Sequence, residues 1–144
     1  MSPGNSVSWK CRKIAEGKAE GEVIISADAI CFYLVQPETG VVVEKHHSLE
    51  GQSIAGKILV MPSGKGSSVV QADGLYKLMK HNKAPRGIIV EFPDPVLVSS
   101  AIVMEIPTVM KVEKQFYETI RSGDRVQIDA DQGAVTIRNE SIAK

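Results

Sequence analysis

The sequence predicts a mixed α/β domain in which many short strands form a closed or barrel-like sheet, with two or three helices on its flank. Runs of β-branched and apolar residues bounded by Gly or Pro recur along the chain, and this pattern is typical of short strands. A few stretches instead repeat apolar residues at three-to-four spacing, which indicates helices. The 144 residues, 43% hydrophobic and 24% charged, are sufficient for one soluble domain with its own core.

The first half of the chain reads as short extended segments. Residues 1–8 are small and polar, so we expect a flexible leader there and a single domain over residues 9–144. The segment around Gly17–Gly21 suits a turn, and Pro37–Gly40 another, because Pro fixes its φ and Gly allows a positive one. Pro62 ends the last run of this half. The expected strands are Lys10–Ile14, Glu22–Ser26, the fully apolar Ile30–Val35, an extended Val41–Glu44, and Ile54–Met61.

The second half alternates helical and extended patterns. Apolar residues at three-to-four spacing after Ser67 and Ser68 predict a helix that one of these serines caps. Pro95 suits the first turn of a second helix. Asp131-Gln132-Gly133 lies between two alternating runs and predicts a hairpin. The expected elements are a strand over Gly87–Phe92, helices over Pro95–Met104 and Lys114–Ile120, and strands over Thr108–Met110, Arg125–Asp129 and Ala134–Arg138.

Composition excludes several classes of function. Seventeen basic residues balance seventeen acidic ones, which argues against a general binder of phosphate backbones. One Trp, three Tyr and three Phe are few for a platform that stacks nucleobases. The longest apolar run, Ala29–Val35, is too short for a membrane span, and Met1–Ser8 does not resemble a secretory signal. Two cysteines make neither a disulfide framework nor a complete metal site. We therefore expect a cytoplasmic protein.

The most informative motif is Pro62-Ser63-Gly64-Lys65-Gly66-Ser67-Ser68. Two glycines flank a lysine there, so the backbone can approach a ligand closely with its amides directed inward. The helix expected directly afterwards adds the positive end of its dipole. The segment suits an anion: a carboxylate, a phosphate or a serine alkoxide. An ordinary capped strand-to-helix turn accounts for these residues equally well, and the local sequence leaves both open.

Other motifs carry less chemistry. Gly51–Lys57 matches the glycine and lysine spacing of a P-loop, but Ile58 stands where a Ser or Thr must bind magnesium, and a strand follows. Ser67 is not part of a nucleophile elbow. His46 and His47 are adjacent in a polar stretch, and we expect both in a surface loop. Cys11 and Cys31 are expected to be small core residues.

The order of several short motifs resembles the small-subunit family of aconitase X. The motifs are Gly17-x-Ala19-x-Gly21, Pro37-Glu38-Thr39-Gly40, His47 to Val60, Pro62 to Ser68, Lys83-Ala84-Pro85, Glu105-Ile106-Pro107 and the closing hairpin. The resemblance covers nearly the whole chain, from Lys10 to Ile137. Each motif is weak alone, but together they are specific.

The resemblance implies a swivelling β/β/α domain that works with a large subunit. In the family that partner carries an iron–sulfur cluster and most of the substrate pocket, so no cofactor is expected in this chain. The family's serine base corresponds to Ser67, while Ser68, Ser63, Gly64, Lys65 and Gly66 would hold it or the substrate. Iron is a Lewis acid that can activate the leaving hydroxyl, which leaves the base to this chain.

Two dehydrations are known in the family, one of phosphomevalonate and one of cis-3-hydroxy-L-proline. Cys31–Gln36 replaces a Gly-Gly segment found in many members, and bulky residues near the substrate would reshape the pocket. We therefore expect a hydro-lyase subunit, inactive alone, for cis-3-hydroxy-L-proline, with phosphomevalonate as the alternative. A stand-alone module that binds a small anion is the alternative from another class.

Overall fold

Eight strands form one hydrogen-bonded sheet in the order β1-β8-β7-β3-β4-β5-β6-β2. The computed structural model describes residues 6–138 of the chain. The strands are β1 Ser6–Lys10, β2 Arg12–Ala15, β3 Lys18–Ile25, β4 Ile58–Met61, β5 Gly87–Val90, β6 Thr108–Met110, β7 Arg125–Asp129 and β8 Ala134–Arg138. The helices are α1 Ser68–Lys80, α2 Pro95–Val103, α3 Lys114–Thr119 and the short 3₁₀ helix η2 Phe32–Leu34. The mixed α/β class with flanking helices is confirmed.

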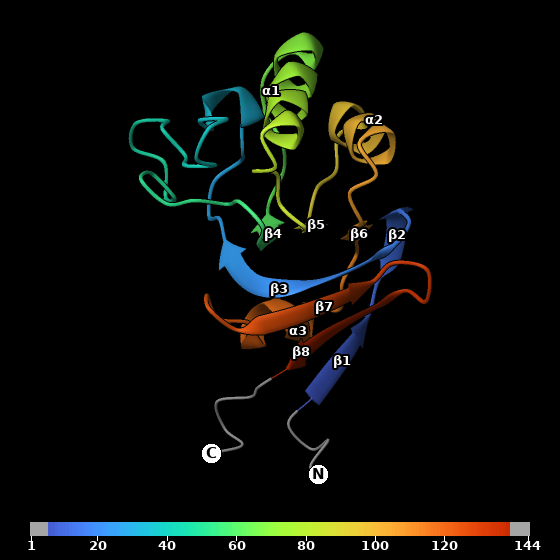
Figure 1. Ribbon diagram of the computed structural model, residues 1–144. Helices are drawn as coiled ribbons and strands as arrows, with labels where there is room; N and C mark the ends of the chain where they lie inside the picture. The colour runs from blue at the N-terminus through green and yellow to red at the C-terminus, as the bar shows by residue number, and fades with distance from the viewer. Residues whose placement is uncertain (1–5, 139–144) are drawn as a thin grey trace.

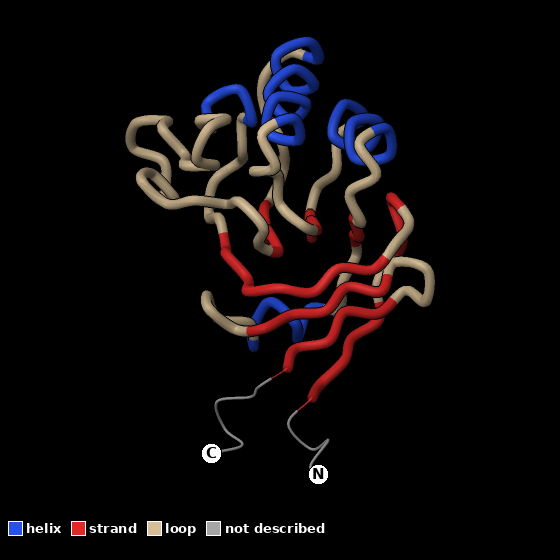
Figure 2. Tube along the Cα trace, in the orientation of Figure 1, coloured by secondary structure: helices blue, strands red, loops and turns tan. Residues whose placement is uncertain are grey.

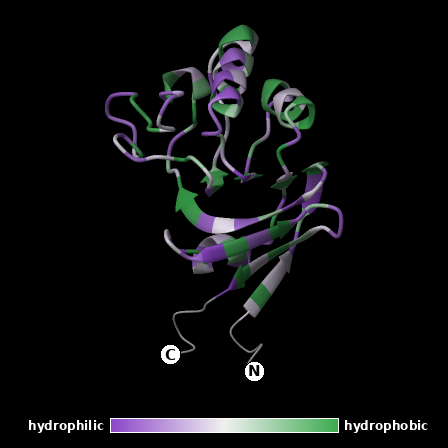
Figure 3. Cartoon of the chain, in the orientation of Figure 1, coloured by the Kyte–Doolittle hydropathy of each residue, from purple (hydrophilic) through white to green (hydrophobic). Residues whose placement is uncertain are grey.

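β3 joins an antiparallel half of the sheet to a parallel half. Its first five residues, Lys18–Glu22, pair antiparallel with β7, and Val23–Ile25 pair parallel with β4. Figure 3 shows the same division, because the amino-terminal part of β3 is hydrophilic and its carboxyl end is hydrophobic. β4, β5 and β6 are parallel to one another, so their carboxyl ends lie at the same end of the sheet.

The parallel strands are buried on both faces, which produces three layers. Ile58 and Val60 of β4 face one core and Leu59 and Met61 the other. The first core lies between the parallel strands and the curled antiparallel strands, and Phe116 of α3 belongs to it. The second core lies under α1, α2 and η2. Figure 1 shows the layers in order, with α1 and α2 above β4, β5 and β6, and β3, β7, β8 and β1 below.

The sheet curls but does not close, so the closed barrel is wrong. Its edges are β1 and β2, which follow each other in the chain with only Cys11 between them. β1 pairs with β8 and β2 pairs with β6, so these two consecutive strands lie at opposite ends of the strand order. The Cys11 N–H donates to the carbonyl of Gly133 (2.9 Å), at the point where the chain passes from one half of the sheet to the other.

Residues 6–8, which the sequence analysis assigned to a flexible leader over residues 1–8, belong to a strand. Ser6, Val7 and Ser8 pair in register with Arg138, Ile137 and Thr136 as part of β1. Residues 1–5 and 139–144 lie outside the described residues. Polar composition alone does not distinguish a leader from an edge strand, because an edge strand faces solvent on several sides.

The buried strand expected over Ile30–Val35 is also wrong. Ile30 and Val35 form only isolated bridges, and Phe32–Leu34 between them form η2. Figure 2 shows that nearly the whole connection from β3 to β4 is loop. Tertiary packing decides this shape: Gly74 of α1 approaches so closely that an added Cβ would lie 2.4 Å from the backbone of Phe32. No helix within residues 6–138 is both long and apolar enough to cross a membrane.

Candidate functional site

The serine loop, residues 62–68, leads from the carboxyl end of β4 into α1. Ser67 has extended backbone angles (φ −67°, ψ 164°), and its Oγ accepts a hydrogen bond from the Val70 N–H at 3.3 Å. The expected capped helix start is therefore confirmed, and Ser67 is the residue that caps it. Both Ser67 and Ser68 are exposed. The Ser67 hydroxyl thus lies at the positive end of a thirteen-residue helix and is open to solvent.

The β3–β4 connection holds the start of the loop in place. The Ile30 N–H donates to the Ser63 carbonyl (2.9 Å), and the Lys65 N–H donates to the Ile30 carbonyl (3.0 Å). The Lys65 amide is therefore already occupied. Gly66 has φ +106°, a conformation that L side chains rarely adopt, so glycine is required there. Within residues 6–138, the amides of Gly66 and Ser67 donate no hydrogen bond, so these two are free to bind an anion.

Lys65 is paired within the chain. Its Nζ lies 2.5 Å from Oε2 of Glu44, which comes from the connection between β3 and β4. The Lys65 side chain is 43% exposed and that of Glu44 21%. An ion pair this open to solvent contributes little to stability. It does compensate the positive charge that the sequence places beside Ser67, so the helix terminus and the free amides provide most of the positive potential there.

Two residues that the sequence analysis did not select, the buried Gln71 and the partly buried Asp94, lie against the loop. Gln71 is only 4% exposed, and its Nε2 donates to the Gly66 carbonyl at 3.0 Å. Asp94 caps α2 through Oδ1, which accepts from the Leu97 N–H at 3.0 Å. The remaining oxygens, Gln71 Oε1 and Asp94 Oδ2, are buried without a donor within residues 6–138. Both face Gly64, where an added Cβ would lie 2.3 Å from Gln71 Oε1 and 3.2 Å from Asp94 Oδ2.

The position of Gln71 in the sequence indicates that its side chain is buried and hydrogen-bonded. It precedes Leu75 and Leu78 by four and seven residues, and both leucines are completely buried. A polar residue on the buried stripe of a helix needs a hydrogen-bond partner. The nearby loop glycines are the natural place for that partner.

The remaining candidates lie apart from the loop. Residues after Lys57 continue as β4, so the rejection of a P-loop is confirmed. His46 is exposed, but His47 is not the surface residue expected. His47 is 6% exposed, its Nε2 lies 2.9 Å from the Ala29 carbonyl, and its Nδ1 accepts from the Leu49 N–H. Both partners belong to the connection between β3 and β4, so His47 braces that connection.

The two cysteines are free. Cys31 is buried beside Gly66, while Cys11 is half-buried between β1 and β2. Burial, and then the charge of Asp129, raises the pKa of the Cys11 thiol to about 11. Within the described part of the chain, no group of three or more His, Cys, Asp or Glu side chains is placed to hold a metal ion. These residues therefore offer no ligand set for an iron–sulfur cluster.

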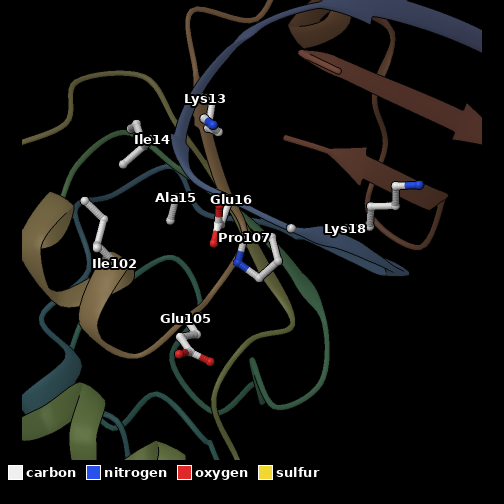
Figure 4. A pocket seen from close by; sticks show the side chains of 9 residues that line it. Lys13, Ile14, Ala15, Glu16, Lys18, Ile102, Glu105 and Pro107 are labelled. Carbon is white, nitrogen blue, oxygen red and sulfur yellow. The ribbon is translucent and has the colours of Figure 1, made fainter. Parts of the chain in front are cut away.

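Two cavities lie away from Ser67. One of about 690 Å³ lies at the amino end of β6, between the end of β2, the Gly17 turn and the α2–β6 connection (Figure 4). A smaller one of about 260 Å³ contains Tyr117, whose hydroxyl is buried without a partner among residues 6–138. Burial first, and then the charges of Glu91 and Cys11, raise the pKa of Tyr117 to about 12. Ser67 lines neither of these two cavities.

Comparison with known proteins identifies the family. The family model for the aconitase X swivel domain matches residues 8–137. The phosphomevalonate dehydratase small subunit of Methanosarcina acetivorans is 45% identical over 132 residues, which cover 91% of each chain. The protein of the same name from Thermococcus kodakarensis is 46% identical over 129 residues, 89% of this chain and 94% of that protein.

A solved structure of the same family also matches this chain. The crystal structure of Thermococcus kodakaraensis aconitase X in its holo-form superposes with a TM-score of 0.83 at 45% identity. The match covers 91% of this chain and 98% of that one. The chain belongs to the aconitase X swivel domain family.

Proposed function

We propose that this chain is the small subunit of an aconitase X-type dehydratase, that it supplies Ser67 as the base, and that the substrate is phosphomevalonate. One observation supports the role of Ser67 most directly. Its hydroxyl is exposed at the amino end of α1, on a loop held by Ile30 and Gln71. A partner subunit that carries the substrate can reach this position without any rearrangement of the core.

The chemistry required of Ser67 is the removal of a proton from the carbon next to a carboxylate. The proton passes to Oγ of Ser67 while the hydroxyl leaves from the neighbouring carbon. A serine hydroxyl is a weak base, so the site must stabilise its ionised form. The dipole of α1 and the Val70 N–H, which already donates to Oγ, both favour that form. A positioned base of this kind contributes about 10²–10⁴-fold to a rate.

The structure weakens the reason for preferring cis-3-hydroxy-L-proline. That preference rested on bulky residues in Cys31–Gln36 reshaping the pocket. Phe32 is 1% exposed and lies in the core under α1, and the centre of the exposed Tyr33 ring lies 5.8 Å from Nζ of Lys77 in that helix. Neither ring is part of the serine loop, and the residue of this stretch that lies beside Gly66 is the small Cys31. The names of the relatives also favour phosphomevalonate, because both are phosphomevalonate dehydratase small subunits.

A large subunit is the expected partner, because the relatives are named small subunits and Ser67 is exposed at the surface of this chain. We place the iron–sulfur cluster and the group that activates the leaving hydroxyl in that subunit. The two free cysteines suit a reducing, cytoplasmic compartment.

The test is a dehydration assay on the chain co-expressed with its large subunit, with phosphomevalonate and cis-3-hydroxy-L-proline as substrates. Ser67→Asn is the informative variant, because Asn also caps helices well but cannot act as the base. We expect phosphomevalonate turnover by the wild-type complex and loss of at least about 100-fold in Ser67→Asn. Ser122→Ala, at an exposed serine between α3 and β7, is the matched control and should retain most activity. Full activity in Ser67→Asn would refute the role of Ser67.

A further inference from the structure

The side chain of Gln71 is hydrogen-bonded to the peptide group that precedes Ser67. The Gln71 backbone N–H donates to the Ser67 carbonyl at 3.0 Å, as the first turn of α1 requires. Its side-chain Nε2 reaches back and donates to the Gly66 carbonyl, also at 3.0 Å. One residue therefore holds the carbonyl groups on both sides of the Ser67 Cα.

This arrangement determines where the Ser67 amide points. In a trans peptide the C=O of one residue and the N–H of the next point in opposite directions. Because Gln71 draws the Gly66 carbonyl into the protein, the Ser67 N–H is directed outward, on the side open to solvent. Gly66 has φ +106° and no side chain to restrict it, so its peptide could otherwise rotate. The hydrogen bond from Gln71 removes that freedom.

The oxygen of the Gln71 side-chain amide lowers the stability of the fold. Its Oε1 is buried without a donor within the described residues and lies against Gly64, close to the equally unpartnered Oδ2 of Asp94. A buried acceptor without a donor lowers stability. A methionine of similar length would fill the same space without that cost. The Nε2 bond to the Gly66 carbonyl is the interaction that only an amide provides.

We propose that Gln71 is a positioning residue for Ser67: it orients the Gly66–Ser67 peptide so that the Ser67 amide and hydroxyl face the substrate together. This inference rests on the proposed function of Ser67. Gln71 does not contact the substrate, and it acts through the backbone. Its loss is expected to affect the rate of the chemical step more than substrate binding, most of which we assign to the large subunit.

The first experiment measures kcat and KM for phosphomevalonate with Gln71→Met in the co-expressed complex. We expect kcat to fall about 10- to 100-fold, because small displacements of a reacting group have effects of that size. KM should stay within about threefold and the melting temperature should not fall. Gln52→Met, at an exposed glutamine, is the matched control. A kcat within about twofold of wild type in a correctly assembled Gln71→Met complex would overturn the proposal.

A second measurement does not depend on any variant folding. In the isotope-labelled wild-type chain, the side-chain amide protons of Gln71 should exchange with solvent at least about tenfold more slowly than those of Gln52. Equal exchange rates overturn the proposal. Failure of the two ideas can be told apart: an active Ser67→Asn complex refutes the serine base, whereas an inactive Ser67→Asn with a fully active Gln71→Met refutes only the positioning role.

Discussion

Replacing Gly64 with alanine tests whether the glycines of the serine loop are required by packing or by backbone conformation. The φ of Gly64 is not in the positive region, so alanine fits its backbone. The obstacle is the Gln71 amide, because the new Cβ would lie 2.3 Å from Oε1 and 3.4 Å from Cδ. Carbon atoms in good contact lie about 3.5–4.0 Å apart, so the amide must move by roughly 1 Å. That movement lengthens its hydrogen bond to Gly66 beyond a useful distance.

The expected cost follows from these contacts. Forcing an extra methyl group into a packed interior costs about 1–3 kcal/mol, and loss of the Gly66 hydrogen bond adds about 0.5–1.5 kcal/mol. We therefore expect Gly64→Ala to lower the free energy of unfolding by about 1.5–4.5 kcal/mol. In a Gln71→Ala background the amide is absent. The same change there should be neutral or stabilise by about 0.4–1 kcal/mol, as Gly→Ala does where the backbone allows it.

Urea unfolding of the four chains, wild type, both single variants and the double variant, gives the coupling energy between the two positions. The new Cβ at position 64 lies 3.2 Å from Asp94 Oδ2 in both backgrounds, so the cost of that contact largely cancels in the coupling energy. If Gly64→Ala costs the same with and without the Gln71 amide, within about 0.5 kcal/mol, the packing explanation is refuted.

Three further predictions concern stability. Gly74→Ala places a Cβ 2.4 Å from the backbone of η2, which cannot give way, so it should cost about 3 kcal/mol or more in a thermal melt; Gly51→Ala, with open space around it, should cost only about 1–2 kcal/mol, the strain of its positive φ. Tyr117→Phe removes a buried hydroxyl without a partner and should raise stability by about 1 kcal/mol. Because burial and neighbouring charges raise the pKa of Tyr117 from 10.0 to about 12, the folded chain holds this proton more tightly than the unfolded chain, so wild-type stability should decline from pH 10 to pH 12 and the decline should be smaller in Tyr117→Phe. Lys65→Met breaks the half-exposed pair with Glu44 and should cost less than about 1 kcal/mol in urea unfolding, and a larger loss would show that the pair matters to the fold.

Much of the local structure was predictable because it depends on neighbours in the sequence. The closing hairpin has the predicted bounds, Arg125–Asp129 and Ala134–Arg138, since alternation and a glycine-containing turn determine it locally. The start of α1 at Ser68, with Ser67 as its cap, follows in the same way from a serine before a helical pattern. Motifs spread along the chain were also sufficient to identify the family, which the comparisons confirm.

The tertiary structure decided what depends on contacts between distant segments. Ile30–Val35 is as apolar as a strand, yet it forms η2 because Gly74 brings α1 against its backbone. Lys65 reads as a free cation in the sequence, but it pairs with Glu44 from another loop. The contact between Gln71 and Gly66 spans only five residues, but which atoms of the Gln71 amide meet Gly66 and Gly64 is known only from the structure. The sequence by itself determined most of the elements, the family and the candidate serine, because these depend on local chemistry and order; the open sheet, the shape of residues 30–35 and the pairing of Lys65 depend on which distant atoms meet in space.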